Sequence, residues 1–190
     1  MSLRRKLLLL GLYVLAAGFI AWKGLVYRDY LRNVPEAMDV WWVRYAWEES
    51  SGFGLPGGYH TGIIVYDMPT AVKTELRESG LAWLNALPWN SWQSSQGSYD
   101  DWHATPVPIT YSWADPAACP PTTSDRYMLV YPKGCPSISG LMNGYGLLPF
   151  DRAVEVMANE ALFSPGAYYA LGRWGILILI PERERIVYVF

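Results

Sequence analysis

Two histidines, His60 and His103, are the residues of this chain best suited to acid–base or metal chemistry. His60 follows a glycine-rich stretch, and His103 follows the acidic pair Asp100 and Asp101. Two imidazoles and two carboxylates can hold a divalent cation or act as a general acid and base. This cluster forms only if the loop around His103 folds over the segment that carries His60. Isolated histidines more often lie in turns, so we predict no metal site and keep a hydrolytic site as an alternative.

The glycine-rich stretch, residues 51–62, reads SGFGLPGGYHTG and contains the spacing G-x-G-x-x-G that cradles pyrophosphate in dinucleotide-binding folds. Such a loop needs a strand before the glycines and a helix after them. Here we expect a helix before the stretch and a strand over residues 59–68 after it, and Pro56 removes one amide donor. We therefore predict a glycine-permitted turn and no nucleotide cofactor.

Aromatic residues gather in residues 88–106, a stretch without helical or strand periodicity. Long irregular stretches of this kind commonly serve function or partner binding. Flat aromatic faces interleaved with short polar groups suit sugar stacking or a protein interface, and the alternative is that they anchor the loop on the core. We predict a ligand or partner surface formed by Trp89, Trp92, Tyr99 and Trp102.

The cysteines of the chain are an isolated pair, Cys119 and Cys135, each followed by proline. In an oxidising compartment such a pair is most simply a disulfide. Closing a loop of this length stabilises a fold by about 3 kcal/mol. We expect this disulfide, with two buried free thiols as the alternative.

A membrane anchor is predicted at the N-terminus, within residues 1–27. Leu7 to Trp22 is an uncharged, mostly apolar run that extends toward Tyr27, close to the roughly 20 residues that a bilayer requires. The basic residues before it, Arg4, Arg5 and Lys6, keep the N-terminus in the cytoplasm by the positive-inside rule. A cleaved secretory signal is the alternative. Either way we expect the rest of the chain to be periplasmic or extracellular, at the inner membrane.

Composition and charge limit the remaining functions. A chain of 190 residues with 52% hydrophobic residues can form one ordinary globular core. Residues 28–190 contain 11 basic and 17 acidic residues, a net charge of about −6, and no basic cluster. Nucleic-acid binding is therefore not expected, because it needs a basic face.

The elements that would position these residues form an α+β domain, with a mainly antiparallel sheet and two to three helices on one face. After the anchor we expect a juxtamembrane helix in residues 28–50 and an exported domain in residues 51–190. The helix carries an aromatic stripe of Trp41, Trp42, Tyr45 and Trp47, which could rest on lipid headgroups or face the protein core. Periodicity predicts strands over 59–68, 107–113 and 126–131, helices over 70–87 and 150–163, and a C-terminal three-stranded meander over 167–190.

The function predicted from these features is a membrane-anchored envelope protein with a binding or accessory domain. Its partner would be another envelope protein or cell-wall glycan. The local signatures of common nucleophilic enzymes, such as G-x-S-x-G and H-E-x-x-H, are absent from the sequence. Two alternatives stay open: an envelope hydrolase using His60 and His103 with Asp100 and Asp101, and an immunity-type inhibitor of an exported toxin.

Overall fold

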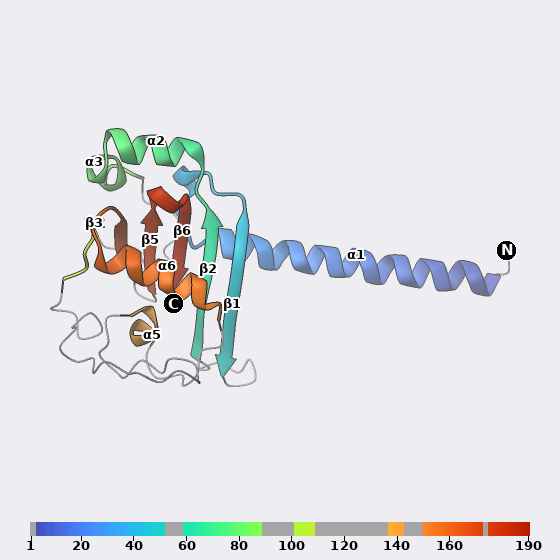
Figure 1. The fold of residues 1–190 in the computed structure, drawn as a ribbon. Coiled ribbons are helices and arrows are strands. Elements are labelled where there is room, and N and C mark those ends of the chain that lie inside the picture. Colours follow the sequence, from blue (N-terminus) through green and yellow to red (C-terminus); the bar gives the residue numbers. More distant parts are fainter. Residues whose placement is uncertain (1–2, 52–58, 89–100, 109–136, 143–149, 173–174) are drawn as a thin grey trace. The chain divides into compact units, whose positions relative to one another are not determined.

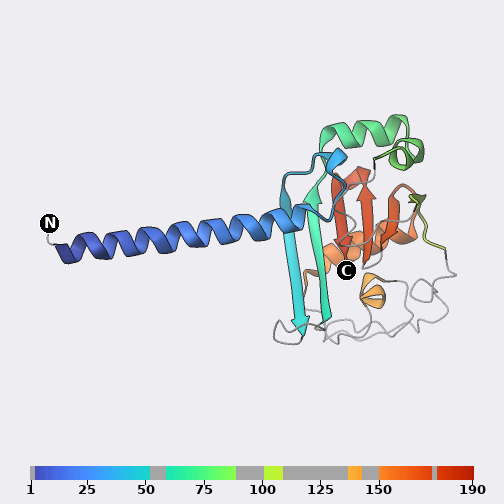
Figure 2. The same cartoon turned by 180° about the vertical axis from the view of Figure 1, so that it is seen from behind.

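A computed structural model describes residues 3–51, 59–88, 101–108, 137–142, 150–172 and 175–190. The chain divides into two compact units, Met1–Asn33 and Val34–Phe190. The second unit is an α+β domain with a six-stranded antiparallel sheet, as the sequence predicts. Figure 1 and Figure 2 show the elements from opposite sides.

The first unit is the long helix α1, Leu3–Leu31. Its segment Leu10–Leu31 has a mean hydropathy of 1.5 and is 22 residues long. By length and composition it can cross a membrane, a property shared with secretory signal sequences. Its apolar side chains from Leu10 to Leu25 are exposed along the helix.

The prediction of a juxtamembrane helix over residues 28–50 is wrong beyond Leu31, where α1 ends. A short 3₁₀ helix, η1 (Glu36–Met38), follows α1, and residues 43–51 form the strand β1, Val43–Ser51. Pro35 lacks the amide that a helix interior needs, and Asp39 adopts a left-handed φ of 49°. A continuous helix therefore does not run through these residues. In β1 the side chains alternate: Tyr45 and Trp47 pack on the core, whereas Ala46 is exposed.

All strand pairs of the sheet are antiparallel, in the order β1-β2-β6-β5-β4-β3. The C-terminal strands form the predicted meander, and β6 inserts between β5 and β2 (Figure 1). The described residues of the predicted strand 107–113 are 107 and 108, which are not in a strand, and the predicted strand 126–131 lies outside the described residues. The remaining strand bounds are β2 Tyr59–Asp67, β3 His103–Ala104, β4 Tyr168–Gly172, β5 Gly175–Ile180 and β6 Arg185–Val189.

The helix predicted for residues 70–87 forms as two helices, α2 (Thr70–Glu78) and α3 (Leu81–Asn85). They are separated at Gly80, which adopts a φ of 53° that side-chain-bearing residues rarely take. The helix predicted for 150–163 forms as α6, Arg152–Phe163. The Asp151 side chain caps it by accepting a hydrogen bond from the amide of Ala153, at 2.8 Å. A further short helix, α5, covers Ile138–Leu141.

Helices pack on both faces of the sheet, not on one face as predicted. Alternate residues of the central strands, such as Ile63 and Ile178, share one core cluster with Ala158 and Leu162 of α6. The intervening residues are also buried, on the opposite face: Ile64, Tyr66, Leu177, Leu179 and Ile186. There Tyr168 lies against Gly80, at the junction of α2 and α3. The sheet is therefore the middle layer of the domain.

The C-terminal residue closes the sheet against a glycine of β2. The amide of Gly62 donates to the carbonyl of Phe190 at 2.8 Å, and the amide of Phe190 donates back to Gly62 at 3.0 Å. A Cβ at Gly62 would lie 2.8 Å from Cε1 of Phe190, so only glycine leaves room for this ring. The Phe190 ring in turn stacks on Tyr188, with centroids 5.2 Å apart.

Tyr188 supplies a test of this packing at alkaline pH. Burial raises the pKa of Tyr188 to about 12, from an ordinary value of 10.0. Between these values the unfolded tyrosine ionises while the folded one stays neutral, so the free energy of unfolding falls as the pH rises, by up to about 1.4 kcal/mol per pH unit. In Tyr188→Phe the free energy of unfolding should fall less over this pH range, because residue 188 can no longer ionise. Denaturant titrations of the full chain in detergent measure it, and parallel curves for the two proteins would contradict the burial of this hydroxyl.

Candidate functional site

The sheet does not bring the two histidines together. His60 lies in β2 and His103 in β3, with β6, β5 and β4 between these strands. The pairing register places His103 in line with Val65, through Tyr169, Ile178 and Val187. The two residues are thus four strand spacings and five strand positions apart, a backbone separation of roughly 25 Å. The backbone places them too far apart for one compact catalytic or metal site.

His103 lies in β3, at the other end of the strand order from β1. Its side chain is exposed, and its ring lies 5.4 Å from that of buried Tyr169, tilted by 36°. Asp101 is exposed two positions earlier, and Asp100 lies outside the described residues. The imidazole therefore covers Tyr169 from the solvent side.

Trp102 does not contribute to an exposed aromatic surface. Its side chain is 8% exposed, and its amide donates a hydrogen bond to Oδ1 of Asn85 in α3, at 3.0 Å. In the described structure Trp102 therefore packs on the core before β3, and the ligand or partner surface stays a prediction. The other aromatic residues of that predicted surface, Trp89, Trp92 and Tyr99, lie outside the described residues.

The predicted disulfide between Cys119 and Cys135 also lies outside the described residues. Within the part of the chain that the structure describes, no group of three or more His, Cys, Asp or Glu side chains could hold a metal ion. Charged and aromatic side chains gather elsewhere on the described surface.

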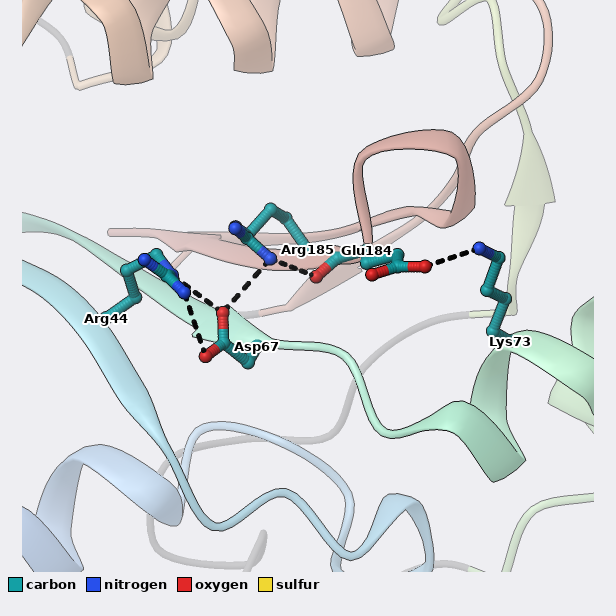
Figure 3. Close-up of polar contacts among 5 residues, drawn as sticks. All are labelled: Arg44, Asp67, Lys73, Glu184 and Arg185. Atoms are coloured by element: carbon teal, nitrogen blue, oxygen red, sulfur yellow. Dashed lines mark hydrogen bonds and ion pairs between the residues drawn. The ribbon is translucent and has the colours of Figure 1, made fainter.

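Such a cluster surrounds Asp67, at the last residue of β2 (Figure 3). Its carboxylate accepts from Nε of Arg44 at 2.8 Å and lies 3.0 Å from Nη1 of Arg185. Beside it, Nζ of Lys73 donates to Glu184 at 2.6 Å. These contacts join β1, β2, β6 and the start of α2 at one end of the sheet.

Two groups of this cluster, Glu184 and Arg44, have pKa values shifted by their partners. The hydrogen bond from Lys73 lowers the pKa of Glu184 below its ordinary value, and the hydrogen bond to Asp67 raises the pKa of Arg44. The Arg44 side chain is 54% exposed, so its guanidinium stays in contact with solvent while Asp67 fixes its direction. The sequence did not reveal this cluster, because its members are far apart in the chain.

An exposed aromatic pair lies at the same end of the sheet. Trp41 and Trp42 immediately precede β1, are 69% and 49% exposed, and meet edge to face with ring centroids 5.8 Å apart. The carbonyl of Trp42 accepts from the amide of Asp67 at 3.1 Å, which ties the pair to the Asp67 cluster. Two exposed indoles thus directly precede the strand that carries the solvent-facing guanidinium of Arg44, and this segment is the candidate site of the domain. Of the predicted aromatic stripe, only this pair remains exposed.

Comparison with known protein families, with characterised proteins and with solved structures finds no match to this chain.

Removal of the central carboxylate should weaken this end of the sheet. Asp67→Ala leaves two arginines without their shared acceptor, and we expect the free energy of unfolding to fall by about 1 kcal/mol, less at high salt. Glu78→Ala, which removes an exposed pair with Arg77 at 3.8 Å, is the matched control and should change stability by less than about 0.5 kcal/mol. Equal losses in the two variants, measured by denaturation of the full chain in detergent, would refute a special role for Asp67.

Proposed function

We propose that this protein is a membrane-anchored component of the cell envelope, whose domain is a binding or accessory module outside the cytoplasm. The observation that carries the proposal is the short connection between the anchor and the domain. Val34, the first residue of the second unit, is 2% exposed and follows Leu31, the last residue of α1, by three positions. Three residues span at most about 10 Å, so a membrane that contains α1 keeps the domain at its surface.

The charges at the two ends of α1 favour this orientation. Arg4, Arg5 and Lys6 precede the apolar span, and basic residues are retained on the cytoplasmic side. The basic residues in the second half of the helix and just after it, Lys23, Arg28 and Arg32, are spaced apart. The contiguous basic cluster lies before the span, which supports export of the domain.

Orientation is tested by fusing alkaline phosphatase, which is active only after export, to the C-terminus of the full chain. We expect high phosphatase activity in the membrane fraction. Replacement of Arg4, Arg5 and Lys6 by glutamate should lower it, because the retained charge is lost. The matched control replaces Arg28 by glutamate and should keep the activity. An inactive fusion of normal abundance would overturn the proposed location.

A protein partner is favoured over cell-wall glycan. Stacking on sugar was expected of an aromatic surface that included Trp102, and that side chain is buried. The sheet, by contrast, ends in β1, which pairs only with β2 among the described strands. A nine-residue edge strand offers backbone groups to which a strand of another protein can add.

The partner is tested with the full chain carrying a photo-crosslinking residue at Ala46, which is exposed in the middle of β1. We expect one discrete protein adduct in native membranes, and none from the same residue at Arg77 on α2. Ala46→Lys should abolish co-purification of the captured protein from gently solubilised membranes, because a charge on an edge strand opposes pairing, whereas Arg77→Ala should not.

Three results would change this proposal. Recovery of the protein without a bound partner would overturn the proposal. Recovery of the protein with bound glycan would place the binding surface in the aromatic stretch of residues 88–106 instead of at β1. Capture of an exported toxin would favour the immunity-type inhibitor.

A further inference from the structure

Trp41 and Trp42 stand out among the large hydrophobic side chains of the domain. In the described part of residues 34–190, the exposed members of this class are Trp41, Trp42 and Val156, at 69%, 49% and 39%. The two indoles are adjacent in sequence and contact each other, whereas Val156 lies in α6. Tyr45 and Trp47, from the same stretch of sequence, pack against the core cluster. The exposed pair is therefore a local feature of the segment before β1.

The segment that carries the pair is fixed to the domain on both sides. Before it, Val34 and Met38 are 2% and 1% exposed, so the chain is already part of the core. After it, the Trp42 carbonyl is hydrogen-bonded to Asp67 and the chain continues directly into β1. The indoles are thus presented by a folded scaffold and not by a free linker.

Chain connectivity also limits how far the pair can lie from a membrane. Trp41 follows Leu31, the end of the apolar span, by ten positions, which corresponds to at most about 35 Å. Part of this segment is folded, so the actual reach is shorter. Tryptophan is the residue most suited to the headgroup region, because its ring is apolar and its N–H is a hydrogen-bond donor. Arg44, three positions after Trp41, adds a guanidinium that suits lipid phosphate.

We propose that Trp41 and Trp42 insert into the headgroup region of the membrane that α1 spans, and so give the domain a second attachment to that surface. The size of the pair favours lipid over a protein partner. Two indoles bury at most about 500 Å², less than the roughly 800 Å² per partner of a stable protein interface. Insertion into a bilayer interface needs no such area, because α1 already supplies the tether. This inference rests on the proposed membrane anchoring.

The test places the photo-crosslinker p-benzoylphenylalanine at single positions of the full chain, reconstituted in vesicles of phosphatidylethanolamine and phosphatidylglycerol. The positions are Leu15 in α1, Trp41 and Trp42 in the pair, and Glu49 on β1 as the matched control. Glu49 is exposed and lies seven positions beyond Trp42 along the same strand direction, roughly 24 Å away. After illumination, mass spectrometry detects the chain with one phospholipid attached.

We expect lipid adducts at Leu15 and at Trp41 or Trp42, and none at Glu49. An adduct at Leu15 without one at Trp41 or Trp42 would overturn the second attachment and leave the anchor in place. Absence of adducts at all positions would overturn the anchor, and the second attachment with it. Equal adducts at Glu49 and the pair would also overturn the inference, because contact would then not be specific to the indoles.

Discussion

Pairing of β6 between β2 and β5 is the contact on which the rest of the domain depends. It joins the N-terminal hairpin of β1 and β2 to the C-terminal meander, so the last residues of the chain complete the middle of the sheet. Each end of the β2–β6 pair is secured by a side chain. At one end Asp67 meets Arg185, and at the other the hydroxyl of Thr61 donates to the carbonyl of Phe190 at 2.8 Å. The register is consequently fixed at both ends, and a shift by one residue would reverse the faces of every buried side chain.

This topology decides which residues can act together. The meander lies between β2 and β3 and so separates His60 from His103. In a smaller sheet, the irregular segment around His103 could have folded over the strand that carries His60. The same topology brings Arg44, Asp67 and Arg185 together from three strands. The domain therefore concentrates charge and exposed aromatic surface where β1 begins, which is the end nearest to α1 along the chain.

Local patterns in the sequence were enough to predict the elements whose signals are local. The meander follows from its nearly continuous apolar residues with turns between them, and α6 follows from its apolar spacing before the stop at Ser164-Pro165-Gly166. Spacing misled at residues 28–50, where Trp41, Trp42 and Tyr45 fit a helical stripe equally well. Strand pairing with β2 decided that case, and pairing depends on residues far away in the sequence.

The site was less accessible to prediction than the fold, for the same reason. Nothing near Asp67 in the sequence indicates Arg44 or Arg185 as its partners, because the sheet register alone brings them together. Trp102 was equally ambiguous, since an aromatic residue in an irregular stretch suits a ligand surface and a core anchor alike. The hydrogen bond that holds its backbone comes from Asn85 in α3, a partner that only the folded chain supplies.

A membrane helix by itself leaves a domain free to rotate about its tether, and a second attachment would remove much of that freedom. If the indoles of Trp41 and Trp42 occupy the headgroup region, β1 starts at the membrane surface and its outer edge has a fixed orientation relative to the membrane. A partner in the same membrane would then meet an edge strand that is already oriented. Part of the entropy cost of association would be met by folding and anchoring, before the partner arrives. The short connection at Val34 and the exposed pair would in this way serve one purpose, which is to present β1.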